Sequence, residues 1–256
     1  MAAPIITLYG TPGVGKTTFA NRDGKNNDSV LFLQFEKGSH GMNIINYPVR
    51  DSDPEHSKYL FKTYPEIMKA LEDIYLSEHS FDTIVFDTID FMEKIIWKHV
   101  ANTKNVKTID DIAYGNGYKL ATTLWDSILD GLEAIRDHRG ITVILLAHAQ
   151  VDRFDDPATD SYNRYIPALH KGIYGKIIAW SDMVLFADQK VFVQEKDAGF
   201  GKKTIKTSAG NRVLYTMERP AFQAKNRFNL PPEIPLDWPT FMETLTTCIN
   251  NRTKEI

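Results

Sequence analysis

Residues 5–18 read Ile5-Ile6-Thr7-Leu8-Tyr9-Gly10-Thr11-Pro12-Gly13-Val14-Gly15-Lys16-Thr17-Thr18. An apolar, β-branched run leads into a loop of the form G-x-x-x-x-G-K-T, and the residues that follow start a helix. Glycines carry no Cβ, so successive backbone N–H groups can converge on phosphate oxygens at the helix N-terminus. The alternative is an ordinary Gly/Pro turn that contains a lysine. The strand–turn–helix context favours a phosphate-binding loop.

Each part of this loop is expected to contact a different part of a nucleoside triphosphate and its metal ion. Lys16 would reach the β- and γ-phosphates, and the Thr17 hydroxyl would bind Mg²⁺, which prefers oxygen ligands and keeps several waters. No guanine-binding Asn/Thr-Lys-x-Asp element is present, so ATP and Mg²⁺ are the predicted cofactors. The predicted nucleotide-binding residues are Gly10, Thr11, Pro12, Gly13, Val14, Gly15, Lys16, Thr17 and Thr18.

Length and composition predict one medium-sized domain with small additions. The 256 residues, 43% apolar and 25% charged, can bury a full core near the size at which single cores stop growing. The formal net charge of −3 gives no overall attraction for nucleic acid. The single Cys248 cannot form an internal disulfide, and no apolar run approaches the ~20 residues that span a bilayer. A soluble, cytoplasmic protein without membrane contact is expected.

Two later apolar strands end in acidic residues. Residues 30–35 read as a buried strand followed by Glu36, and residues 81–86 read as another followed by Asp87. Open α/β sheets place their chemistry at the carboxyl ends of strands. Glu36 could deprotonate the water that attacks the γ-phosphate or be a surface residue in a turn, and position leaves both open. Asp87 is predicted to be the Walker B acid that holds Mg²⁺, with Asp90 as the back-up acid.

A third buried strand, residues 141–147, brings His148 and Gln150 to the same edge. A polar side chain here could contact the γ-phosphate and report hydrolysis to the next segment, and this role is favoured for His148 over a hydrogen-bonded strand end. Residues 151–171 are predicted to be a long polar loop. Its aromatic and basic residues could stack on bases and neutralise phosphates of a single strand, or be a solvated loop.

The segments that lie between and after these candidate site residues are predicted mainly as structural elements. Residues 114–118 read as a glycine-broken loop before an amphipathic helix at 120–136, and residues 183–187 read as another strand. Antiparallel hairpins are predicted after this strand, with glycine turns at 199–201 and 209–211. This region is expected to extend the parallel core at one side.

Lys225 and Arg227 form a cationic pair near the end of the chain. They lie two residues apart, so on a strand both point to the same side. They could reach the nucleotide of a neighbouring subunit, as an arginine finger does, or be surface cations before a proline turn. The residues alone favour surface cations.

The order of these elements resembles the RecA-like branch of the P-loop ATPases, and most of all the compact bacteriophage members, which include the Sak-type single-strand annealing proteins. The resemblance runs from about residue 5 to residue 232 and rests on Phe35-Glu36-Lys37-Gly38, Gly115-Asn116-Gly117-Tyr118, Ala147-His148 and Ala224-Lys225-Asn226-Arg227. It implies a three-layer α/β sandwich whose central sheet is mostly parallel, with antiparallel hairpins at one side. Residues 1–232 would be the RecA-like ATPase core, and residues 233–256 a C-terminal helix and tail.

The resemblance also implies roles for single residues. Glu36 becomes the general base, and His148 stands where the family has a γ-phosphate-sensing glutamine. Lys225 and Arg227 are similar to the Lys-x-Arg pair that replicative RecA-fold helicases insert into the adjacent subunit's site. The segment after His148 and the segment 110–118 stand in the places of RecA's second and first DNA-binding loops. The candidate DNA-binding residues are Tyr118, Arg164, Tyr165 and Lys171.

The resemblance therefore implies a phage-encoded ATPase that acts in the cytoplasm of a bacterial host. It would hydrolyse ATP with Mg²⁺ and bind single-stranded DNA in recombination, by single-strand annealing. The implied partners are further copies of the chain, in a ring or filament, and a phage single-strand-binding protein. A replication motor or helicase loader is the alternative, and a small-molecule nucleotide kinase is less favoured because no Arg-rich lid is visible. A nucleotide-gated structural protein that hydrolyses little is a further possibility.

Overall fold

The computed structural model describes residues 3–25, 27–39, 41–48, 59–155, 160–197 and 202–254. The strands in these ranges are β1 Ile5–Gly10, β2 Val30–Gln34, β3 Ile45–Asn46, β4 Thr83–Asp87, β5 Thr142–Phe154, β6 Tyr162–Pro167, β7 Met183–Asp197, β8 Lys202–Tyr215, β9 Lys225–Asn226 and β10 Glu233–Pro235. The α-helices are α1 Lys16–Ala20, α2 Tyr64–Leu76, α3 Ile89–Thr103, α4 Asn116–Arg139, α5 Lys171–Trp180 and α6 Trp238–Lys254. Short 3-10 turns cover Arg22–Gly24, Ile109–Asp111 and Ala113–Gly115.

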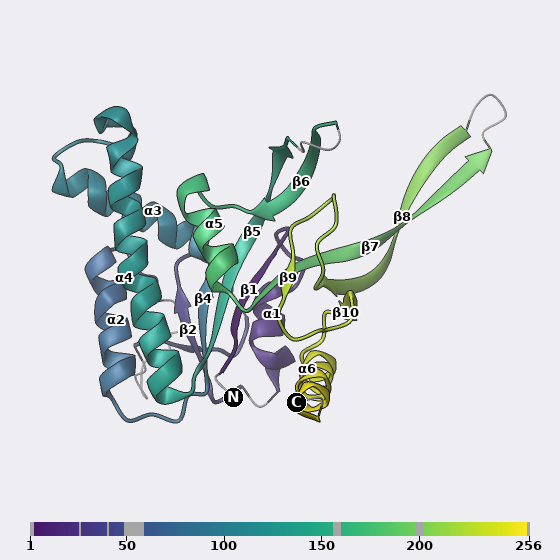
Figure 1. The fold of residues 1–256 in the computed structure, drawn as a ribbon, viewed down its shortest axis with the longest axis horizontal. Helices are drawn as coiled ribbons and strands as arrows, with labels where there is room; N and C mark the ends of the chain where they lie inside the picture. Colours follow the sequence, from purple (N-terminus) through teal and green to yellow (C-terminus); the bar gives the residue numbers. More distant parts are fainter. Residues whose placement is uncertain are drawn as a thin grey trace.

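These strands form one sheet with the order β10-β8-β7-β1-β5-β4-β2-β3 (Figure 1). The six strands from β7 to β3 run parallel. At one side β8 pairs antiparallel with β7, and β10 pairs antiparallel with β8. The strands β6 and β9 pair antiparallel with β5 and β7. All six residues of β1 are buried, as expected for a parallel strand covered on both faces. The first strand of the loop motif is therefore central in the sheet.

Helices cover both faces of this sheet, so the molecule has three layers (Figure 1). Alternate residues of β1 enter different clusters, because side chains of a strand point to opposite faces: Ile5 and Tyr9 enter one, Ile6 and Leu8 the other. The first cluster is closed by buried residues of α2, α3, α4 and α5, among them Ile67, Ile96, Trp125 and Ile173. The second is closed by α1 and α6, through Phe19, Phe241 and Leu245. The predicted fold class, a three-layer α/β sandwich with antiparallel pairing at one side, is confirmed.

The C-terminal segment packs on the second face. The Phe19 ring of α1 meets the rings of Trp238 and Phe241 edge-on, at centroid distances of 5.2 and 5.4 Å. The strand β10 pairs with β8 and lies just beyond the predicted domain boundary at residue 232. That boundary stays a prediction. Within the ranges that the structure covers, no helix is both long and apolar enough to cross a membrane.

The prediction of a long loop over residues 151–171 is wrong for the part that the structure describes. The strand predicted at 141–147 continues to Phe154, and β6 returns beside it with Phe154 opposite Tyr162. These two rings lie 5.4 Å apart, and such cross-strand pairs stabilise a hairpin. Much of the hairpin is exposed, so its sequence lacks the apolar alternation by which a strand is recognised.

The glycine-broken loop predicted at 114–118 is also wrong in part. Gly117 and Tyr118 lie in the first turn of α4, which starts at Asn116. A Cβ on Gly117 would lie 2.7 Å from the Ile109 carbonyl oxygen, so the glycine permits close packing rather than a turn.

The turn predicted at 209–211 is replaced by a continuous strand. Gly210 has φ +72° inside β8, and the β7–β8 register shifts between Gln189 and Val191 on the opposite strand. A glycine with positive φ beside a register shift is typical of a β-bulge. The two strands form a long ribbon that extends away from the three layers (Figure 1). The turn predicted at 199–201 lies outside the described residues.

Candidate nucleotide-binding site

The predicted phosphate-binding loop begins where β1 ends. Gly13 and Gly15 have φ of +76° and +111°, in the left-handed region that favours glycine. A Cβ on Gly10 would lie 2.4 Å from the Ala187 carbonyl oxygen of β7, so this position also excludes larger residues. The loop enters α1 at Lys16. Backbone N–H groups at such a loop and helix start suit phosphate oxygens.

Lys16 folds back over its own loop. Its side chain is buried, and Nζ donates hydrogen bonds to the carbonyl oxygens of Gly10 and Thr11 at 3.0 and 3.1 Å. Burial lowers the pKa of Lys16, and the nearby Asp87 carboxylate opposes this shift. An ammonium has three donors, and these carbonyls engage two of them. The cation is thus held at the mouth of the glycine loop, which fits the phosphate tail of a nucleotide.

Thr17 and Asp87 are brought together from the two predicted motifs. Thr17 Oγ1 donates a hydrogen bond to Asp87 Oδ2 at 2.9 Å. Asp87 ends β4 and is buried, and this burial raises its pKa to about 6. A hydroxyl and a carboxylate suit Mg²⁺, whose charge would favour the ionised acid. The pair offers only two ligand oxygens, which fits an ion such as Mg²⁺ that keeps several of its waters.

Glu36 lies beside this pair rather than in a solvated turn. The Glu36 side chain is 19% exposed, and Thr88 Oγ1 donates to Glu36 Oε1 at 3.0 Å. Thr88 directly follows the Asp87 of β4, and Gln34, at the end of β2, is the register partner of Asp87. The pairing of β2 with β4 therefore brings the Glu36 carboxylate into contact with Thr88, the residue that follows the candidate metal ligand Asp87.

His148 completes the cluster from β5. Its Nε2 lies 3.7 Å from Glu36 Oε1, and its register partner on β1 is Gly10, where the loop begins. The structure therefore brings the predicted γ-phosphate-side residues to one edge of the sheet. Gln150, two residues further, instead donates to the Leu169 carbonyl oxygen at 3.4 Å.

Asp90, the predicted back-up acid, contacts His148. Both of its carboxylate oxygens contact His148, at the backbone N–H and at Nδ1. Burial alone would raise the pKa of Asp90, but the hydrogen bonds from His148 hold it below its usual value. In this structure Asp90 therefore holds His148 in place, and a role as back-up metal ligand stays a prediction. Its place in the first turn of α3, three residues after Asp87, gives no sign in the sequence of this contact.

The structure places Lys225 and Arg227 at the opposite edge of the sheet. Arg227 pairs with Asp182 at 3.0 Å and also donates to a carbonyl of α5. Lys225 Nζ donates to three carbonyl oxygens at the C-terminus of α5, those of Ile178, Ala179 and Ser181. Cations stabilise this end of a helix. Four residues of parallel strand, or ~13 Å, separate this edge from the loop of the same chain. A role in a neighbouring subunit's site stays a prediction.

Two candidate DNA-binding residues have internal partners. The Tyr118 hydroxyl donates to Asp110 at 2.7 Å, and its ring stacks on His170 at a centroid distance of 4.2 Å. The Arg164 guanidinium pairs with Glu218 at 2.9 Å and lies over the ring of Phe154.

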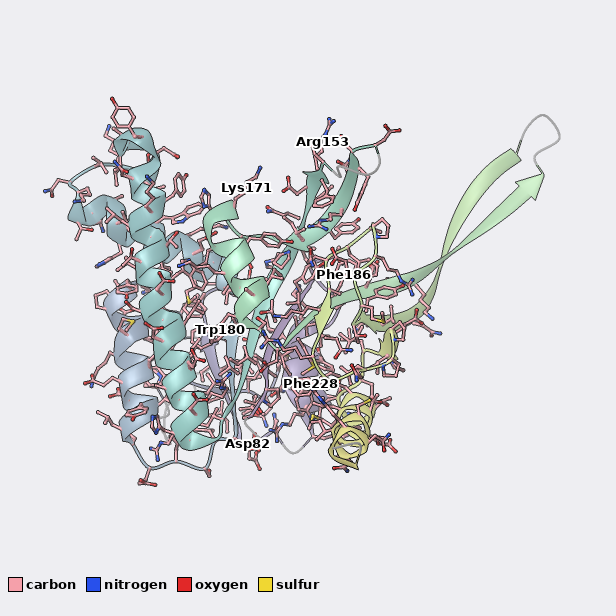
Figure 2. The ribbon with its side chains drawn as sticks, in the orientation of Figure 1. Asp82, Arg153, Lys171, Trp180, Phe186 and Phe228 are labelled. Atoms are coloured by element: carbon pink, nitrogen blue, oxygen red, sulfur yellow. The ribbon has the colours of Figure 1, made fainter. Side chains whose placement is uncertain are left out.

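The other two candidates are more open to solvent. Tyr165 is 37% exposed while its ring stacks on Phe186, and Lys171 is exposed in the first turn of α5. Figure 2 shows Lys171 and Arg153 of the β5–β6 hairpin at the same end of the molecule, away from Asp82. Asp82 precedes β4, so Lys171 and Arg153 lie toward the edge that carries the nucleotide site.

Comparison with known proteins gives a family. Residues 2–228 match the AAA domain family. No curated protein matches the chain. Among solved structures it is similar to the RadB recombinase, with 14% identity, 93% of this chain and 90% of that chain covered, and a TM-score of 0.49. It is also similar to the flagellar accessory protein FlaH from Methanocaldococcus jannaschii, with 12% identity, coverage of 91% and 84%, and a TM-score of 0.41. Because the family match spans most of its length, the chain belongs to the AAA domain family, a family of ATPases.

Proposed function

We propose that this protein is a Mg²⁺-dependent RecA-like ATPase that hydrolyses ATP by in-line attack of water. The hydrogen bond between Thr17 and Asp87, which joins the phosphate loop to the acid of β4, carries the proposal. A hydroxyl and a carboxylate meet where the phosphate tail and its ion are expected. Membership of the AAA domain family supports nucleotide hydrolysis.

The side chains around this contact divide the work of hydrolysis. Lys16 and the loop amides bind the phosphate tail, and Thr17 and Asp87 hold the ion. When bound, Mg²⁺ supplies positive charge that draws phosphate oxygens and stabilises developing negative charge. Glu36 accepts the proton of the attacking water.

The geometry of Glu36 suits a general base. In the described part of the chain, the Thr88 hydroxyl and His148 Nε2 both lie next to the same carboxylate oxygen, Glu36 Oε1. This arrangement orients the carboxylate and leaves Oε2 to accept a proton from water. His148 is the polar group that would meet the γ-phosphate, and Asp90 holds its ring.

We further propose that the ATPase acts on single-stranded DNA in phage recombination, by annealing, as a homo-oligomer and with a phage single-strand-binding protein as partner. The resemblance to compact phage RecA-like ATPases supports this role. The position of exposed Lys171 and Arg153 at the end of the molecule that carries the nucleotide site also supports it (Figure 2). Cations and aromatic rings suit a single strand, since every base can stack and every phosphate carries charge.

The test is the ATPase rate with and without single-stranded DNA, measured together with particle size. We expect Mg²⁺-dependent hydrolysis that DNA stimulates and that rises with oligomer size. Lys16→Ala should abolish hydrolysis while its circular dichroism spectrum stays that of the wild type. Unchanged hydrolysis in this variant would refute the site. Stimulation by duplex rather than single-stranded DNA, with unwinding, would assign a replication motor instead.

A further inference from the structure

Arg212, at the base of the β7–β8 ribbon, lies against the phosphate loop. An ideal Cβ built on Gly15 would meet Arg212 Nη1 at 2.8 Å and Arg212 Cδ at 3.7 Å. The same point lies 3.5 Å from Leu236 Cδ2. The Arg212 carbonyl accepts a hydrogen bond from the Leu236 N–H at 3.1 Å, which fixes the backbone of the arginine. The guanidinium therefore stands beside the residue that precedes Lys16.

The guanidinium of Arg212 has no acidic partner within the described residues. It is exposed and makes no hydrogen bond or ion pair there. Other arginines of the same chain pair with carboxylates, namely Arg22, Arg136, Arg164 and Arg227. An unmatched, permanently charged group next to a phosphate-binding loop is well placed for an anion.

The order of the strands tells which end of a nucleotide Arg212 would meet. Asp87, proposed for the metal, ends β4, and Glu36, proposed for the water, follows β2; both strands lie on one side of β1. Arg212 comes from β8, on the other side of β1. A triphosphate whose γ-phosphate points toward β4 directs its nucleoside end toward β8. The arginine is thus at the α-phosphate end of the tail.

We propose that Arg212 binds the α-phosphate of the nucleotide held by its own chain. This assignment rests on the proposed ATPase function. A planar guanidinium forms paired, charge-assisted hydrogen bonds with phosphate oxygens, which a lysine cannot reproduce. Arg212 would thereby contribute equally to the binding of ATP and ADP, which share the α-phosphate.

Isothermal titration of the full-length chain with ATP, ADP and inorganic tripolyphosphate, each with Mg²⁺, tests this assignment. Arg212→Ala should weaken the binding of ATP and of ADP by the same factor, about ten- to a hundredfold, as expected for a lost charge-assisted hydrogen bond. The binding of tripolyphosphate should weaken by a similar factor, because its third phosphate can take the place of the α-phosphate. Arg212→Lys should lose part of this affinity. The control is Arg219→Ala, because Arg219 lies over Tyr215.

Several outcomes would overturn the assignment. Unchanged ATP affinity in a folded Arg212→Ala variant would remove Arg212 from the site. If the variant loses affinity for ATP but not for ADP, Arg212 binds the γ-phosphate instead. If it loses affinity for the nucleotides but not for tripolyphosphate, Arg212 contacts the base or the ribose. If the wild type binds ATP and Lys16→Ala abolishes binding, the ATPase site stands whatever Arg212 does. If the wild type binds no nucleotide, the proposed function fails first.

Discussion

Asp90 Oδ1 accepts a hydrogen bond from the backbone N–H of His148 at 3.0 Å, and Asp90 Oδ2 lies 3.0 Å from His148 Nδ1. One carboxylate thus holds both the backbone of β5 and the plane of the imidazole ring. With Nδ1 engaged, Nε2 is the nitrogen that lies near Glu36. The hydrogen bond to Asp90 raises the pKa of His148, which favours the charged ring at the site.

Asp90→Asn should lower kcat about ten- to a hundredfold and leave the affinity for a non-hydrolysable ATP analogue within about threefold. An asparagine has one acceptor oxygen in place of two, so it cannot hold both the backbone N–H and Nδ1–H as the carboxylate does, and the ring loses its fixed orientation. The pKa of His148, followed by NMR, should fall because the carboxylate charge is gone. Asp111→Asn is the control. An unchanged pKa of His148 would contradict the positioning role.

Glu36→Gln should still bind ATP but hydrolyse it about 10²–10⁴ times more slowly. The glutamine carbonyl can still accept the Thr88 hydrogen bond, so the structure is preserved while the proton acceptor is lost. Single-turnover hydrolysis and analogue binding measure the two effects separately. Residual hydrolysis close to the wild-type rate would mean that another group activates the water.

Arg227→Ala should bind ATP and hydrolyse it poorly if the residue serves a neighbouring subunit. Mixing it with Glu36→Gln should restore part of the activity, because one mixed interface then holds both an intact Glu36 and an intact Arg227. Arg136→Ala, which also loses a surface ion pair, is the control for altered stability. An absence of rescue in mixtures that assemble normally would limit Arg227 to its contact with Asp182.

Glu93→Gln should change how stability depends on pH. Burial raises the pKa of Glu93 from 4.5 to about 7, with Asp90 adding to this shift and the His170 N–H and Lys94 opposing it. Between these values the unfolded chain is ionised and the native chain is protonated, so native stability falls as pH rises.

The glutamine does not titrate and keeps an acceptor for the His170 N–H. The free energy of unfolding of Glu93→Gln, relative to that of the wild type, should therefore increase from pH 4.5 to pH 8, by an amount on the order of 3 kcal/mol. Urea unfolding at several pH values measures it. Glu243→Gln, on the exposed side of α6, should leave the pH profile unchanged. If the stability of Glu93→Gln depends on pH as that of the wild type does, Glu93 is ionised in the native state.

Lys171→Ala should weaken the binding of single-stranded DNA at low salt. Loss of one phosphate contact should also reduce the slope of log K against log salt by about 0.7. Fluorescence anisotropy over a salt series measures both quantities. Lys69→Ala, whose lysine pairs with Glu72 and Asp73 on α2, is the matched control. Equal effects of the two substitutions would argue against a DNA site at the start of α5.

The structural elements around the candidate site that the sequence predicted correctly are local features of the chain. The glycine loop, the helix that starts at Lys16 and the buried strand that ends at Asp87 are local features, and all three are present. A run of apolar residues reports that a strand is buried on both faces, and the rules of parallel sheets then bring strand ends to one edge. The sequence by itself therefore determined the fold class and the edge that holds the candidate site.

Only the tertiary structure decided which side chains meet across that edge. The pairing of Asp90 with His148, the hydrogen bonds of Lys225 to α5 and the place of Arg212 beside Gly15 join segments far apart in the chain. The exposed β5–β6 hairpin was missed for a related reason, since its stability comes from cross-strand pairs rather than from a buried face. Local periodicity records burial, whereas the partner of a polar side chain depends on how distant elements pack.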